Sequence, residues 1–102
     1  MKFIYITFNI TLLGQILEMI DGFGFQNYQV LEKVLSKTAV GDPRMDSAVW
    51  PSYSAAVIIQ ACPNDKVEEL YQDIEQRNQN RFNDQEFISL VVMPADKIIV
   101  PN

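Results

Sequence analysis

The stretch KFIYITF, residues Lys2 to Phe8, is typical of a β-strand that is apolar on both faces. It is rich in β-branched and aromatic residues and contains no turn signal. Side chains alternate across a strand, which places two apolar sets back to back: Phe3, Tyr5 and Thr7 against Ile4, Ile6 and Phe8. A sheet with one solvated face would be polar at every second position. This stretch therefore predicts a sheet that is covered on both faces.

Three further segments have strand character: Phe25 to Leu35, Tyr53 to Cys62 and Glu86 to Met93. The last two repeat the two-sided apolar pattern, and each is followed at once by a proline that ends it. A short strand or turn is also expected over Lys97 to Val100. Between the second and third strands, residues 36 to 52 show no sustained period, so they form one long loop, and loops of this length are usually functional.

Two segments have helical spacing. The first is capped by Asn9 or Thr11 and ends at Gly22, which we expect in the left-handed conformation that closes a helix. The second begins with a capping pair, Asp65 and Glu68, and runs to about Asn78. Their apolar stripes are Leu12, Leu13, Ile16, Leu17 and Ile20, then Val67, Leu70, Tyr71 and Ile74.

The order β-α-β-β-α-β predicts an α+β ferredoxin-like sandwich, with a four-stranded antiparallel sheet and both helices on one face. At 102 residues the chain fits a single domain, 1–102. The helices leave one apolar sheet face bare, and such a patch predicts self-association. The alternative is a monomer whose long loop folds across that face.

Composition removes several classes of function. A net charge of −5 with only eight scattered basic residues argues against binding nucleic acid. No apolar run is long enough to insert into a membrane as a helix, and the start shows no signal peptide, so we expect a cytoplasmic protein. With no histidine and one cysteine, Cys62, the common catalytic triads are impossible, which indicates a protein that is not an enzyme.

A family resemblance adds to this interpretation. The start MKFIYI, the helix end DGFGF at residues 21–25, the long loop and the pair Trp50-Pro51 at its end resemble a divergent subgroup of the PII-like signal-transduction superfamily. That superfamily is related in fold to the divalent-cation tolerance proteins. The resemblance implies a homotrimer with inward-facing sheets, clefts between subunits that bind a small molecule or ion, and a long loop that contacts a target such as a membrane transporter or an enzyme.

Two features depart from the classical members. No glycine follows the second helix, where residues 78–84 are NQNRFND, so a phosphate-cradling turn is not carried over. The loop from 36 to 52 also lacks a tyrosine for modification. The cofactor, if there is one, stays unknown.

Candidate ligand-binding residues are charged or aromatic groups at these positions. They are Lys37, Asp42, Arg44 and Trp50 on the loop, with Arg81 after the second helix. The alternative is a solvated surface. We assign no metal site, since the acidic helix face from Glu68 to Glu75 suits solvent and Cys62 suits buried packing.

The leading hypothesis is a PII-like regulatory protein that senses a small ligand or ion and signals through residues 36–52. One alternative is a dimeric ferredoxin-like enzyme of the cofactor-free monooxygenase or isomerase type. The other is a purely structural oligomer.

Overall fold

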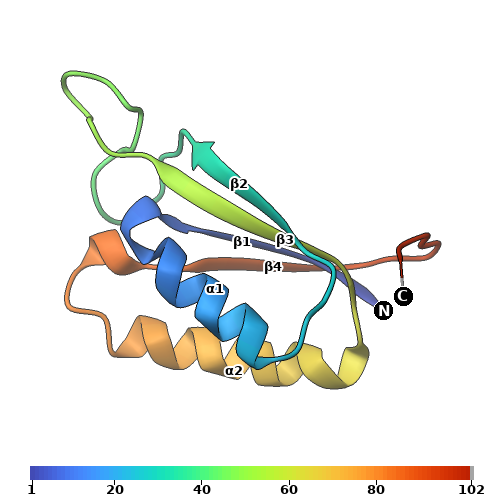
Figure 1. Ribbon diagram of the computed structural model, residues 1–102. Coiled ribbons are helices and arrows are strands. Elements are labelled where there is room, and N and C mark those ends of the chain that lie inside the picture. Colours follow the sequence, from blue (N-terminus) through green and yellow to red (C-terminus); the bar gives the residue numbers. More distant parts are fainter. Residues whose placement is uncertain (102) are drawn as a thin grey trace.

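The computed structural model describes residues 1–101 and shows an antiparallel sheet with its helices on one side (Figure 1). The strand order is β2-β3-β1-β4, which confirms the predicted α+β ferredoxin-like sandwich. In chain order the elements are β1 (Lys2–Asn9), the 3-10 turn η1 (Ile10–Leu12), α1 (Leu13–Gly22), β2 (Gln29–Val34), β3 (Ser54–Cys62), α2 (Asn64–Gln79), the 3-10 turn η2 (Asp84–Glu86) and β4 (Ser89–Pro94).

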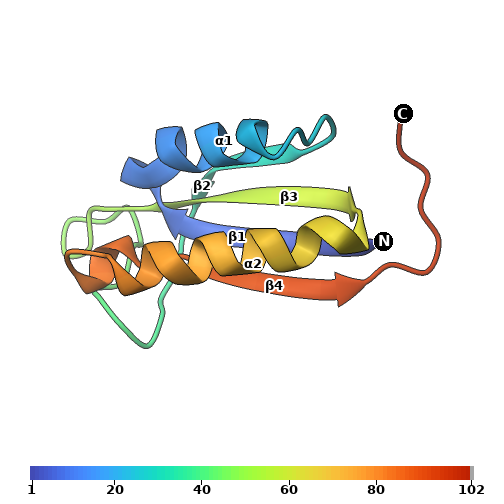
Figure 2. The same ribbon diagram turned by 90° about the horizontal axis from the view of Figure 1, so that it is seen from below.

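The core lies between the sheet and the helices. In β1, Ile4, Ile6 and Phe8 are fully buried, and they face α1 and α2 together with neighbours on β3 at matching register positions. Seen from below, α1 lies along the β2 side of the sheet and α2 along the β4 side (Figure 2). The helices add apolar side chains to the same cluster: Ile16, Met19, Ile20, Leu70 and Ile74. Burial of each such side chain is worth about 1.5–3 kcal/mol.

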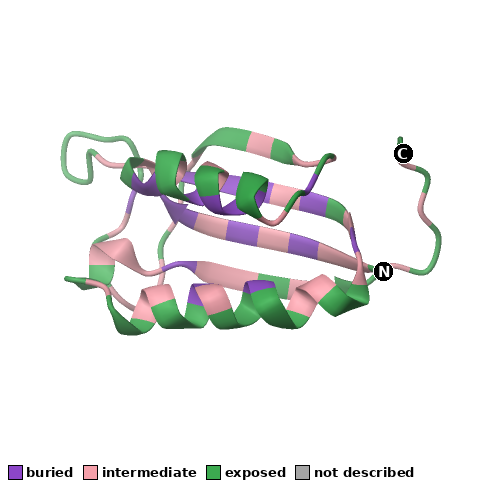
Figure 3. Ribbon diagram, turned by 60° about the horizontal axis from the view of Figure 1, so that its bottom comes forward, coloured by how far each residue is buried: buried purple, intermediate pink, exposed green. Residues whose placement is uncertain are grey.

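The opposite face of the sheet is also apolar, as the sequence predicted. On it Phe3 pairs with Met93 and Tyr5 with Val91. Val91 and Met93 are 48% and 42% exposed, and Leu31 on β2 is 42% exposed. We refer to this surface as the open face. Along β1 the burial colours alternate between buried and intermediate, as expected where only one face is covered by helices (Figure 3).

Some predicted details of the helices and strands were wrong. The first helix ends at Gly22 as predicted, but the left-handed residue is Gly24, with φ of 79°, and not Gly22. The second strand starts only at Gln29, because the residues from Phe23 to Tyr28 form the turn out of α1. Asp65 does not cap the second helix, since the helix starts one residue earlier and its N-cap is Pro63, which has no side-chain acceptor.

The end of the chain differs in two ways. The fourth strand is shorter than expected, since residues 84–86 form the turn η2 and the strand begins at Ser89. Lys97 lies in a bend, and Ile98 to Val100 have no regular secondary structure and pair with no strand in the described residues. Among residues 1–101, no helix combines the length and apolar character needed to cross a membrane.

Candidate functional site

The long connection between β2 and β3 has two structurally distinct parts. The first, residues 36–44, we call the loop base; the second, residues 45–51, we call the loop tip. The base is closed by an antiparallel bridge in which Ser36 and Arg44 exchange two backbone hydrogen bonds of 2.8 Å. The connection extends past the end of the sheet (Figure 1). The loop that the sequence predicted to be irregular therefore contains a short hydrogen-bonded bridge at its base.

Arg44 anchors the loop base. It is only 4% exposed, its Nε donates to Ser54 Oγ (2.7 Å), and its Nη1 donates to Gln85 Oε1 (3.2 Å). Ser36 Oγ and Ser54 Oγ share a further hydrogen bond of 2.8 Å. Burial lowers the pKa of the Arg44 guanidinium from its ordinary value. Within residues 1–101 this cation forms no ion pair, so neutral oxygen atoms hold it in place.

The loop base covers one end of the open face. Since Ala55 points into the core, the neighbouring Ser54 points to the open face, where Arg44 reaches it. Gly41, at φ of 76°, lies so close to η2 that a Cβ would come within 3.3 Å of the Asp84 backbone oxygen. The base thus runs from the β2 edge to the turn that precedes β4. The long loop therefore covers this end of the open face. It does not cover the rest, where Leu31, Val91 and Met93 remain exposed.

The loop tip is ordered by its own hydrogen bonds. Trp50 N donates to Ser47 Oγ (3.0 Å), Ser47 N donates to Trp50 O (2.9 Å), and Asp46 N donates to Ser52 O (2.9 Å). Asp46 has φ of 50° and forms an ion pair with Lys33 on β2. This backbone presents Val49 and Trp50 outward, at 74% and 39% exposure.

Arg81 lies in the turn after α2. Its Nη1 donates to the Asn78 carbonyl (2.7 Å), its Nη2 pairs with Asp84 (3.0 Å), and its guanidinium lies over the Phe87 ring at 5.2 Å. The Nε is buried and has no partner within residues 1–101. Arg81 is therefore held mainly by its own turn, and its one nitrogen without a partner within residues 1–101 is buried.

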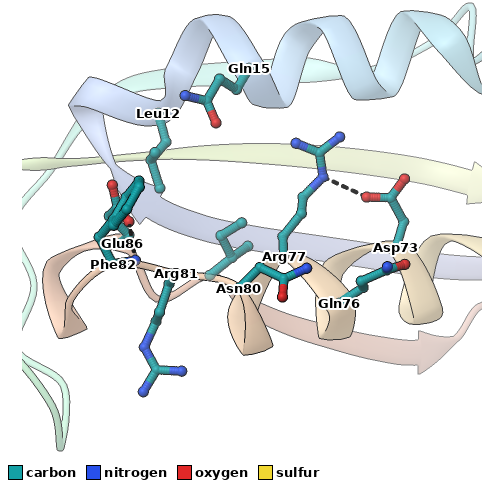
Figure 4. A pocket seen from close by; sticks show the side chains of 10 residues that line it. Leu12, Gln15, Asp73, Gln76, Arg77, Asn80, Arg81, Phe82 and Glu86 are labelled. Carbon is teal, nitrogen blue, oxygen red and sulfur yellow. Dashed lines mark hydrogen bonds and ion pairs between the residues drawn. The ribbon is translucent and has the colours of Figure 1, made fainter.

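A groove of about 470 Å³ separates α1 from the C-terminal half of α2 (Figure 4). Its lining includes Leu12 and Gln15 from one side and Arg77, Asn80 and Phe82 from the other. A second hollow, of about 440 Å³, lies between α2 and β4, and Arg81 and Ile88 line both.

The predicted site residues do not form one site. Lys37 and Asp42 are exposed on the loop base, Trp50 lies on the tip, and Arg44 is buried. Arg44 and Arg81 are brought near each other only through η2, which contacts both.

Other polar groups were missed by the sequence reasoning. Gln85 and Ser54 were not predicted, since nothing in their neighbours signals a contact with Arg44 across the fold. Arg77 could have been found, because it follows Asp73 by four residues on a helix and pairs with it. In the described part of the chain, no three histidine, cysteine, aspartate or glutamate side chains are grouped as metal ligands would be. Cys62 is buried, which raises the pKa of its thiol.

Comparison with known proteins gives a likeness in fold. No family model matches the chain, and no curated protein matches it. Among solved structures, a candidate PII-like signaling protein from Thermus thermophilus matches with a TM-score of 0.54 and 18% sequence identity. The match covers 89% of this chain and 82% of that chain. The element order, the open sheet face and this likeness together show that the chain has a PII-like fold.

Proposed function

We propose that this protein is a PII-like regulator rather than an enzyme. Three copies pack their open faces inward, a small ligand or ion binds in the clefts between subunits, and the loop of residues 36–52 carries the signal to a protein partner. A membrane transporter or an enzyme is the expected kind of partner. The likeness to a candidate PII-like signaling protein supports the general regulatory role.

The observation that carries the proposal is the open face. Leu31, Val91 and Met93 are each more than two-fifths exposed, although all three belong to strands of the central sheet. A contiguous apolar surface of this kind marks an interface, because water contact with it is unfavourable. Closed symmetry lets several copies cover it at once.

The loop tip supports the signalling part. A tip already ordered by hydrogen bonds loses little conformational freedom on binding, and an exposed tryptophan is a frequent anchor in protein interfaces. Val49 and Trp50 provide that kind of contact surface. The exposed charges of Lys37 and Asp42 then lie close by in the sequence and are available for polar contacts at the rim.

Mass in solution is the direct test. Multi-angle light scattering on a size-exclusion column is expected to give three times the chain mass of 11.7 kDa. A dimer would favour the ferredoxin-like enzyme, and a stable monomer would contradict the packing of open faces.

Ligand binding needs its own test. We expect one member of a panel of nucleotides, divalent metals and carboxylic acids to raise the thermal unfolding midpoint, because a ligand that binds only the folded state stabilises it. No shift with any member would favour a purely structural oligomer.

A further inference from the structure

The groove between α1 and α2 contains a cation with free donors. Arg77 Nε is engaged by Asp73, but within residues 1–101 its terminal Nη1 and Nη2 have no hydrogen-bond partner. Figure 4 shows the guanidinium directed away from α2, toward the side of the groove that α1 forms. The paired donors of a guanidinium match the two oxygens of a carboxylate. Arg77 therefore provides a place for one carboxylate.

The rest of the groove is suited to an apolar body. Leu12 and Ile88 are 7% and 5% exposed and contribute apolar surface to its lining. Phe82, which also lines the groove, is 96% exposed as a residue, which is unusual for a phenylalanine. A ligand that covered this ring would remove apolar surface from water. The lining thus combines a carboxylate contact with an aromatic contact.

The same groove is connected to η2. Glu86 lines it and accepts a hydrogen bond from the Phe82 backbone nitrogen at 2.8 Å. Arg81 also lines it and pairs with Asp84 at 3.0 Å. A ligand that contacts Phe82 would act directly on the residue that Glu86 holds.

The other side of η2 supports the loop base. Gln85 Oε1 accepts from Arg44 Nη1 at 3.2 Å, and the backbone of Asp84 packs against Gly41. Consecutive residues of one short turn therefore contact the groove and the loop base.

We propose that this groove is an effector site for small carboxylates with an apolar body, and that η2 transmits its occupancy to the loop. The ligand carboxylate binds the free nitrogens of Arg77, and its apolar part packs on Phe82. A ligand packed on Phe82 shifts the backbone of residues 82–86, and this shift alters the hydrogen bond between Gln85 and Arg44. The biological output rests on the proposed function, whereas binding in the groove and the loop response need no partner.

Trp50 makes the response measurable, because it is the only tryptophan of the chain and lies on the loop tip. Titration with phenylacetate is expected to change its fluorescence in a saturable way and to give binding heat in calorimetry. The neutral analogue 2-phenylacetamide should do neither, since it lacks the carboxylate. Arg77→Gln should weaken phenylacetate binding about tenfold or more, because a hydrogen bond to a charged group is lost. Asp73→Asn should keep or tighten it, because the competing carboxylate is removed.

Gln85→Ala tests the transmission. It is expected to bind phenylacetate as the wild type does but to lose the Trp50 response, which also controls for direct quenching by the ligand. Gln85→Glu keeps an acceptor for Arg44 and should keep the response. No binding to the wild type, or equal binding to Arg77→Gln, overturns the site. An unchanged Trp50 response in Gln85→Ala overturns the transmission. The mass in solution, measured on the same samples, tests the trimer independently of both results.

Discussion

The two faces of the sheet are built from the same strands but differ in how far their side chains are buried. On the helix-covered face, Phe8 is fully buried among side chains of both helices. On the open face, Phe3 is only partly buried and Val91 is 48% exposed. The residue types are similar, so the difference comes from what lies above each face. The first face completes the fold of one chain, and the second is the surface through which copies of the chain are proposed to meet.

The open face itself is covered by the chain at one end and left uncovered at the other. At the end where the strands meet the long loop, the chain covers its own open face, because Arg44 lies over Ser54 and seals it from solvent. Elsewhere on that face the chain supplies no cover within residues 1–101. Self-contained polar packing and exposed apolar surface thus occupy the two ends of one sheet face.

The largest effect is expected from the same substitution made on opposite faces of β1. Phe8→Ala should lower the free energy of unfolding by about 3–5 kcal/mol, since it leaves a cavity in the core. Phe3→Ala should cost less, and its cost should rise with protein concentration, because association stabilises the folded state. Urea unfolding, repeated at two protein concentrations, measures the free energy of unfolding of both variants and its dependence on association. If Phe8→Ala does not fold, Phe8→Leu provides a milder version of the same comparison. Equal, concentration-independent losses for the two alanine variants would contradict the distinction between the faces.

A charge on the open face should act on assembly more than on folding. Val91→Glu is expected to reduce the mass in solution to that of one chain, because an unpaired carboxylate is costly in an apolar interface. The far-ultraviolet circular dichroism should stay that of the wild type. Glu69→Gln, an exposed position on α2, is the matched control and should leave the mass unchanged. An unaltered mass for Val91→Glu would place the interface elsewhere.

The periodic parts of the fold were predictable because local pattern decides them. The alternation of residues along β1 is enough to place Ile4 and Ile6 on one face and Tyr5 on the other. The prediction of a left-handed Gly22 failed because the sequence offers two similar signals at the end of the first helix. Gly22 and Gly24 are both able to take the left-handed conformation, and in the structure Gly24 takes it.

The site was less predictable, because its contacts join distant parts of the chain. Arg44 was singled out for its charge and loop position, yet its burial depends on Ser54 and on Gln85, 41 residues away. No periodicity encodes such a contact. The spacing of Asp73 and Arg77 indicates only a surface ion pair, and the two Arg77 nitrogens that have no partner within residues 1–101 are recognised only from the fold, beside α1.

An intermediate effect is expected at the loop base. Arg44→Ala should lower the free energy of unfolding by about 1–3 kcal/mol, because Ser54 and Gln85 lose a charged donor. Trp50 emission should shift in the folded protein, since the base no longer fixes the tip. Lys37→Ala, exposed on the same base, should change stability by no more than about 0.5 kcal/mol. Similar behaviour of the two variants would show that the base is not held by Arg44.

The smallest effect is expected where the loop tip meets the sheet edge. Asp46, through its hydrogen bond and its charge, raises the pKa of Lys33 from the ordinary value of 10.5. A raised pKa in the folded state means that the pair contributes fully below pH 10.5, and that its contribution is lost as the pH rises through the folded-state value. Lys33→Gln should therefore lower the unfolding midpoint slightly at about pH 7 and about pH 9, and the difference from the wild type should vanish above the folded-state pKa. Other groups titrate alike in both proteins and cancel in this difference. Because both side chains are well exposed, added salt should also reduce the difference. A difference that persists at high salt and high pH would mean that Lys33 acts through its packing on Tyr53, whose ring lies 5.3 Å from its Nζ, and not through Asp46.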